Sequence, residues 1–314
     1  MPKLSIAKSN FMYRLKVSII ILSYNTKELL KKCLDSLGGV GKELDFEIII
    51  SDNGSTDGTL DLLKRLKMEK FKDLKIVENP ENLGFAKGNN RAKRVVQGEY
   101  VLFLNSDTEV CPGVLKNTVA YLDKNNDVGA LTCKLVLPDG NLDKDVRRSF
   151  PTPWVSFTHF THLDRIFTRS KIFSRYWCEY SDPDQTQEVD VIQGAFFLAR
   201  KNLLDEVGWF DEDYFLDGED IDLCWKIKEK GYKIIYYPQV SILHVKGASK
   251  GKNHFLENKP KLHDRLRYAM SGVESMEIFY KKRLWAKYPL PVNLAVLIGI
   301  NVLRAVRYFK LLSQ

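Results

Sequence analysis

The chain has 314 residues, of which 44% are hydrophobic, 11% aromatic and 28% charged, as in a folded globular protein. This composition excludes a disordered, collagen-like or disulfide-stapled chain. Its five cysteines are scattered without a CxxC pair, which argues against a zinc site and favours a reducing, cytoplasmic compartment.

The net charge of +8 is concentrated at the C-terminus. Residues 246–314 contain 14 Lys and Arg against 4 Asp and Glu, so the rest of the chain is slightly acidic. A nucleic-acid-binding protein would carry basic and aromatic residues across its folded part, so no nucleic-acid partner is expected. A basic tail beside an apolar run indicates an anionic membrane surface instead. Residues 1–16 lack the apolar stretch of a signal peptide.

Strand and helix patterns alternate in the first part of the chain. The predicted strands are 17–22, 46–51, 74–78, 100–104 and 128–132, and the predicted helices are 26–37, 59–66, 85–96 and 112–125. Apolar strands that alternate with helices predict an α/β protein with a mostly parallel sheet flanked by helices. Ligands of such sheets bind beyond the carboxyl ends of the strands.

The pattern is less regular in the second part. A turn at 138–140 indicates a hairpin, and 147–187 shows no sustained period and is interpreted as an insertion. A strand at 189–199, a helix at 201–207, a helix from about 218 to 230 and a strand pair at 233–245 complete the expected core.

Polar loops follow three of the predicted strands, and two of these loops contain two glycines each. In SDNGSTDGT (51–59), Asp52 could accept hydrogen bonds from a base or ribose. In ENLGFAKGNN (81–90), a helix start with Gly84 and Lys87 favours a diphosphate. In FLNSDT (103–108), Asp107 suits Mg²⁺ or Mn²⁺, which prefer oxygen ligands. Each loop, taken alone, is equally compatible with a turn or a helix cap.

An acidic run and one histidine are the remaining candidates. Residues 211–222 contain seven carboxylates, more than capping of the next helix by Asp217 requires. Such a concentration of like charge requires a compensating cation or indicates a proton-transfer role. His244 follows a predicted strand, where a single histidine is more often structural than a ligand.

Six features, taken in order, resemble the motifs of bacterial family 2 glycosyltransferases of GT-A fold. They are SIIILSYN, SDNGSTDGT, ENLGFAKGNN, FLNSDTEV, the 192–232 segment and His244. The resemblance is to the rhamnosyltransferase-like and galactofuranosyltransferase-like branch and extends over residues 17–245. It implies a Rossmann-like fold and a nucleotide diphosphate sugar donor. The acceptor would be a hydroxyl of a glycan or polyprenyl-linked molecule in cell-surface polysaccharide synthesis, and a rhamnose-like sugar is favoured.

The resemblance also implies roles for individual residues. Asp220 matches the catalytic base, and Asp107 and His244 match ligands of a divalent metal, Mg²⁺ or Mn²⁺. The first position of the metal motif is Asn105, where relatives have Asp. The implied binding residues for the nucleotide sugar are Ser23, Tyr24, Asn25, Asp52, Gly84, Lys87, Asn105 and Ser106. Those for the donor sugar or acceptor are Gln193, Gly194, Ala195, Trp209 and Glu219. The implied reaction is a single displacement that inverts the anomeric carbon.

The expected organisation is a GT-A domain at 15–250, with a nucleotide-binding half at 15–132 and an acceptor half at 133–250. A basic helical region follows at 251–314. Only 16 uncharged residues separate Lys287 from Arg304, fewer than a membrane-spanning helix needs.

A C-terminal helix would place Val302, Ala305, Val306, Phe309 and Leu312 on one face and Arg304, Arg307 and Lys310 on the other. That pattern is typical of a helix lying in a membrane interface, here expected to be the inner face of the cell membrane, or of a terminal helix docked on the domain or on another subunit.

Two other classes stay open at this stage. One is a sugar nucleotidyltransferase, although the glycine-rich, Arg-containing loop expected after its first strand is absent. The other is a non-catalytic nucleotide-sugar or glycan-binding protein, which would have little use for Asp107, Asp220 and His244. The donor sugar, the acceptor and the oligomeric state cannot be read from the sequence.

Overall fold

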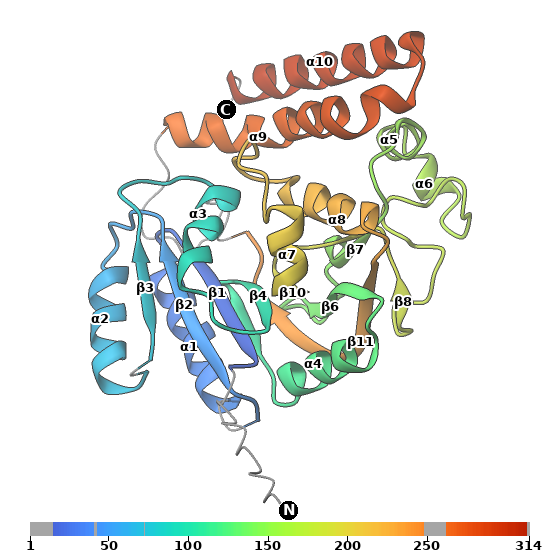
Figure 1. The fold of residues 1–314 in the computed structure, drawn as a ribbon. Coiled ribbons are helices and arrows are strands. Elements are labelled where there is room, and N and C mark those ends of the chain that lie inside the picture. The colour runs from blue at the N-terminus through green and yellow to red at the C-terminus, as the bar shows by residue number, and fades with distance from the viewer. Residues whose placement is uncertain (1–14, 41–42, 72, 248–261, 313–314) are drawn as a thin grey trace, which may run out of the picture.

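The computed structural model describes residues 15–40, 43–71, 73–247 and 262–312 (Figure 1). Within these residues the chain forms one large mixed sheet with the strand order β3-β2-β1-β4-β10-β6-β11-β5, and β8 pairs with β11. Its strands are β1 Val17–Ser23, β2 Phe46–Asp52, β3 Lys75–Glu78, β4 Tyr100–Asn105, β5 Thr108–Val110, β6 Val128–Val136, β8 Gln187–Glu188, β10 Phe196–Arg200 and β11 Lys233–His244.

The first four strands are parallel. Strands β1, β2 and β4 are almost completely buried on both faces, as continuous apolar runs require, whereas the edge strand β3 is only half-buried. Strands β6 and β11 are also parallel, whereas β10 runs antiparallel to β4 and β6, and β5 antiparallel to β11. The helices that connect or flank this part are α1 Lys27–Val40, α2 Thr59–Glu69, α3 Phe85–Arg91, α4 Val114–Lys124, α7 Lys201–Val207 and α8 Glu219–Glu229. The predicted mostly parallel α/β fold is thereby confirmed.

Several predicted elements differ in detail. The strand predicted at 189–199 is two strands, β9 Val191–Ile192 and β10, and β9 pairs with β7 (Arg147–Arg148) in a separate small sheet. The strand pair predicted at 233–245 is the single strand β11, whose pairing with β6 shifts between Tyr237 and Ser241. Pro238 lies inside this shift and has no N–H to donate. The helix predicted at 85–96 continues from α3 as a 3₁₀ turn, Ala92–Val95.

The segment interpreted as an insertion is folded. It contains α5 Pro153–Phe160, which begins with a Thr152 side-chain cap and a proline in its first turn, and the short α6 Leu163–Ile166. The turn expected at 138–140 is present, because the Gly140 N–H donates to Leu137 and the Leu137 N–H to Asn141.

The C-terminal region is a pair of helices, α9 Leu262–Phe279 and α10 Leu290–Leu312, which lie side by side across the top of Figure 1. A short π-helical segment, Tyr280–Leu284, and a 3₁₀ turn, Trp285–Lys287, join them. We call residues 262–312 the C-terminal hairpin. Its Phe279, Tyr280 and Leu284 form a buried cluster with Tyr214, so the hairpin packs on the rest of the chain.

Helix α10 differs from the sequence expectation in two ways. Leu290–Lys310 is 21 residues long with a mean hydropathy of 1.5, so by length and composition alone it could cross a membrane. The 16 uncharged residues between Lys287 and Arg304, counted alone, predicted a helix too short to do so. The basic residues of the predicted amphipathic face are partly used inside the hairpin. Arg304 pairs with Glu277, and Arg307 donates to the Ala269 carbonyl. The side chain of Leu312 lies outside the described residues.

Candidate active site

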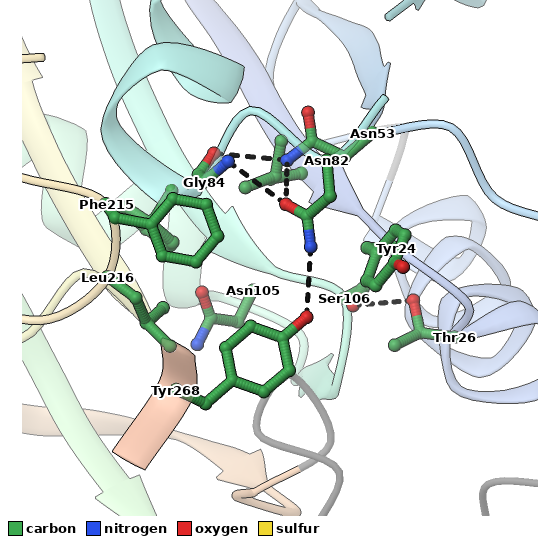
Figure 2. A pocket seen from close by; sticks show the side chains of 12 residues that line it. Tyr24, Thr26, Asn53, Asn82, Gly84, Asn105, Ser106, Phe215, Leu216 and Tyr268 are labelled. Carbon is green, nitrogen blue, oxygen red and sulfur yellow. Dashed lines mark hydrogen bonds between the residues drawn. The ribbon is translucent and has the colours of Figure 1, made fainter. Parts of the chain in front are cut away.

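The polar loops predicted from the sequence meet at the carboxyl ends of β1, β2 and β4. Pairing places Ser23 beside Asp52 and Leu22 beside Asn105, so residues from three loops share one edge of the sheet. A pocket opens there (Figure 2). Its lining residues are Leu22, Tyr24, Thr26, Asn53, Asn82, Gly84, Phe85, Asn105, Ser106, Phe215, Leu216 and Tyr268.

Amide side chains hold the loops of this pocket together. The Asn53 amide donates to Asn82 Oδ1 at 3.3 Å and to the Gly84 carbonyl at 3.1 Å, and Asn82 Oδ1 also accepts the Gly84 N–H. Gly84 has a φ of +83°, and a Cβ there would lie 2.3 Å from the Phe215 carbonyl oxygen. The position therefore requires glycine, because the loop containing Phe215 lies directly on it.

The loops after β1 and β2 are also joined. Asn25 Oδ1 accepts the Thr56 N–H at 2.7 Å, and the Asn25 N–H donates to Ser55 Oγ. Asp52 Oδ1 accepts the Ser55 N–H, whereas Asp52 Oδ2 is buried without a hydrogen-bond partner. Burial raises the pKa of Asp52. An unpartnered carboxylate oxygen at this edge can accept an N–H or O–H of a ligand.

Asp107 and His244 are brought together from positions 137 residues apart, since β5 pairs with the end of β11. Both side chains are about 2% exposed, and His244 Nε2 lies 3.5 Å from Asp107 Oδ1. On the other side of the ring, Asp143 Oδ2 lies 2.9 Å from His244 Nδ1, and Lys246 pairs with Asp143. Burial lowers the pKa of His244, but the two carboxylates outweigh burial and raise it to about 9.

The Asp107 and His244 pair fits a divalent metal. Asp107 Oδ1 is buried without a hydrogen-bond partner, and Asp143 directs His244 Nε2 toward it. Two ligands of an octahedral ion lie about 3 Å apart, close to the separation seen, and substrate phosphates and water commonly supply the others. No cluster of three or more His, Cys, Asp or Glu ligands occurs in the described part of the chain, so a metal would depend on the donor for further ligands.

Asp220 lies in the first turn of α8 and is nearly buried. Arg148, from β7, donates to its Oδ2 at 2.5 Å, and Asp220 Oδ1 accepts the Ile221 N–H. Burial lowers the pKa of Arg148, but the charge of Asp220 and neighbouring groups outweigh it, so the net pKa is raised. A permanent cation therefore lies against the carboxylate and fixes its orientation.

The acidic run at 211–222 has the cations that its charge requires. Lys282 pairs with Asp211 and Asp213, and Arg283 forms a two-bond pair with Asp222 at 2.7 and 3.0 Å. Asp222 is completely buried. Helix α8 is preceded by Gly218 in the left-handed conformation, so the predicted Asp217 cap is not formed. Much of the run thus fixes the C-terminal hairpin.

Replacing Arg283 by Met should destabilise the protein, because Asp222 would remain buried without its main counter-charge. We expect a loss of about 3 kcal/mol in the free energy of unfolding, and the thermal midpoint should fall by about 6 to 12 °C. Lys281→Met is the control, since Lys281 is exposed and, among the described residues, pairs with the nearby Glu277 alone. Equal midpoints for Arg283→Met and the wild type would contradict this role.

The other predicted residues fall in different places. Gln193, Gly194 and Ala195 link β9 to β10, and Gln193 Oε1 is buried without a hydrogen-bond partner. Glu219 is buried beside Asp220 at the start of α8. Lys87 is half-buried on α3 but does not line the pocket.

Trp209 lies in the core of the described fold. It is 1% exposed, its ring packs against Phe103 of β4, and its Nε1–H donates to Asp205. The ring therefore packs in the core and does not line the pocket of Figure 2.

Three residues near the site had no sequence signal of their own: Asp143, Arg148 and Tyr268. Asp143 and Arg148 contact His244 and Asp220 across 101 and 72 residues, respectively. Tyr268 comes from the C-terminal hairpin to the pocket of Figure 2. The sequence contained only an indirect signal for such partners. The excess negative charge of the acidic run at 211–222 indicates that cations lie nearby in the fold, but not where they are in the chain.

The model of glycosyl transferase family 2 matches residues 18–208, more than half of the chain. The chain belongs to this family and is a glycosyltransferase. It is 25% identical over 246 residues to N-acetylglucosaminyl-diphospho-decaprenol L-rhamnosyltransferase of Mycobacterium tuberculosis, an alignment that covers 75% of this chain and 78% of the relative.

Solved structures share the fold. A mannosyltransferase from Pyrobaculum calidifontis, in complex with GDP-Man and Mn²⁺, matches with a TM-score of 0.55 and 23% identity over 86% of this chain. GalNAc-T7, with UDP, GalNAc and Mn²⁺, matches with a TM-score of 0.57 and 16% identity over 82% of this chain. This chain covers 66% and 48% of those two chains.

Proposed function

We propose that the protein transfers a sugar from a nucleoside diphosphate sugar to a hydroxyl of a glycan or polyprenyl-linked acceptor, with inversion. The observation that carries this proposal is the Asp107 and His244 pair at the edge of the sheet that also forms the polar pocket. A rhamnose-like sugar is favoured, because the curated relative described above is a rhamnosyltransferase. Synthesis of a cell-surface polysaccharide is the proposed context.

Each group has a defined task in this proposal. A bound Mg²⁺ or Mn²⁺ would stabilise the charge that develops on the departing diphosphate. Asp107 and His244 hold that ion, and Asp143 keeps the histidine ring in orientation. Asp220 accepts the proton of the attacking hydroxyl as the new bond forms. Lys87, which has no ion pair with another described residue, is available for the diphosphate.

The alternative classes predict different products. A sugar nucleotidyltransferase would release pyrophosphate from a nucleoside triphosphate and a sugar phosphate, and a binding protein would bind a nucleotide sugar without turnover. Membership of the family favours transfer over both. The test is to incubate the protein with a panel of nucleotide sugars in the presence of Mg²⁺ or Mn²⁺ and to measure both binding and release of the nucleoside diphosphate, since binding without release would indicate a binding protein. Binding that depends on the metal supports the proposal, and failure of the whole panel to bind contradicts it.

We also propose that the protein is cytoplasmic and lies on the inner face of the cell membrane through α10. Leu290, Leu294, Ile298, Val302, Val306 and Phe309 recur at helical spacing, and each is at least half exposed. The opposite side of α10 packs on α9 through Arg304 and Arg307, so the helix presents its apolar side outward. This arrangement fits a helix lying in a bilayer interface.

Vesicles that contain anionic lipid should therefore bind the protein. Changing Leu294, Ile298 and Val302 together to Ser should reduce cosedimentation by at least about tenfold, because roughly 25 cal/mol is lost per Å² of apolar area. These side chains are 50–65% exposed, so the fold should persist. High salt should also weaken binding, since it screens the basic C-terminal region. Equal cosedimentation of the triple variant and the wild type would contradict the proposal.

A further inference from the structure

Tyr268 brings the C-terminal hairpin into the donor pocket. It lies near the start of α9, 186 residues from Asn82, whose Nδ2–H donates to its hydroxyl oxygen at 3.0 Å. Figure 2 shows the ring facing the pocket from the side opposite Asn53 and Gly84, which come from two different loops. The residue is therefore part of the pocket wall rather than of the hairpin surface.

The position of this ring is fixed by neighbouring contacts. Tyr268 stacks against Phe215 with ring centroids 6.2 Å apart and planes 15° apart, and the guanidinium of Arg267 lies 3.4 Å from the Phe215 centroid. The Phe215 carbonyl in turn accepts the Phe85 N–H at 2.7 Å. The start of α9, the Phe215 loop and the glycine loop thus form one contact unit.

The chemistry of the pocket wall favours one part of a nucleotide. The lining side chains include no charged group, so the pocket does not suit a phosphate by itself. It combines aromatic faces from Tyr24, Phe215 and Tyr268 with the amides of Asn53 and Asn82. Flat rings with hydrogen-bonding edges, such as nucleobases, are bound by stacking on aromatic side chains.

We propose that Tyr268 forms an aromatic wall for the nucleobase of the donor. The inference rests on the proposed use of a nucleotide sugar and adds a base-binding residue from outside the 18–208 family match. It also makes the hairpin part of the donor site. Arg307 of α10 donates to the carbonyl of Ala269, the residue after Tyr268, so the helix with the exposed apolar face supports this wall directly.

The test is calorimetric titration of nucleoside diphosphates, namely UDP, dTDP, GDP and ADP, with Mg²⁺ present. Tyr268→Ala should weaken the best of them by at least about fivefold, the lower end for loss of one stacking partner. Tyr268→Leu, which keeps an apolar side chain but no ring, should lose a similar amount. Tyr268→Phe should lose less than about threefold, because the ring remains.

Two controls isolate contact with the base. Inorganic pyrophosphate should bind Tyr268→Ala and the wild type equally, and Tyr308→Ala, on the exposed side of α10, should bind nucleotides normally. If Tyr268→Ala and Tyr268→Leu bind nucleotides as tightly as the wild type or more tightly, the inference about Tyr268 is overturned and the proposed function is not affected. If Tyr268→Ala weakens the binding of pyrophosphate as much as the binding of nucleotides, the inference is also overturned, because the residue would then affect the pocket as a whole rather than the base. A wild type that binds no nucleotide overturns the proposed function as well.

Discussion

Asp220→Asn should lower the rate of sugar transfer by about 10²- to 10⁴-fold, the usual contribution of a general base. The amide has the shape of the carboxylate but cannot take the proton of the acceptor hydroxyl. Arg148 can still donate to the amide oxygen, so the fold around α8 should persist. Donor affinity should change by no more than a few-fold. Initial rates and donor dissociation constants measure the two effects separately.

The control for this substitution is Asp213→Asn. Asp213 belongs to the same acidic run but its side chain is 67% exposed, and its one ion pair within the described ranges is with Lys282, so transfer should be nearly unchanged. Asp222 would be a poor control, because it is buried and fixes Arg283. Full activity of Asp220→Asn, or a loss of donor binding in proportion to activity, would remove Asp220 from this role. Glu219 and Asp217 would then be the next candidates.

The second large effect is expected at Asp107. Asp107→Ala should abolish most metal-dependent transfer, because it removes the only carboxylate that faces His244 Nε2 among the described residues. Binding of Mn²⁺ in the presence of nucleoside diphosphate should weaken strongly, which electron paramagnetic resonance measures without turnover. Asp145→Asn is the matched control, since Asp145 pairs with Lys246 on the outer side of the cluster. Undiminished transfer by the wild type in excess EDTA would contradict a metal requirement.

The sequence predicted that the polar loops would meet at one edge of the sheet. Strands β1, β2 and β4 are buried on both faces, so their apolar runs could be read directly, and the polar loops at their ends had to meet. Asp107 and His244 were paired only through a family resemblance. The strand β5 that brings them together has three residues, too few for a recognisable pattern.

The contacts of Asp220, His244 and the acidic run were harder to predict because they are long-range. Arg148 reaches Asp220 through a two-residue strand, and Asp143 reaches His244 from a 3₁₀ turn. The family resemblance placed Trp209 near the donor sugar or acceptor, yet its ring packs against Phe103 of β4. The acidic run correctly indicated missing cations, but Lys282 and Arg283 lie 60 or more residues later in the chain. Ion pairs between residues so far apart in the chain leave no periodic pattern in the local sequence.

The most direct test of a single displacement is the stereochemistry of the first product. Proton NMR can follow the donor that binds best while the wild-type protein, with Mn²⁺, transfers its sugar to an acceptor or to water. The early product should have the anomeric configuration opposite to that of the donor, and Asp220→Asn should form it at least about 100-fold more slowly. Retention of the donor's configuration, or product formation at the same rate without metal, would contradict the proposed mechanism.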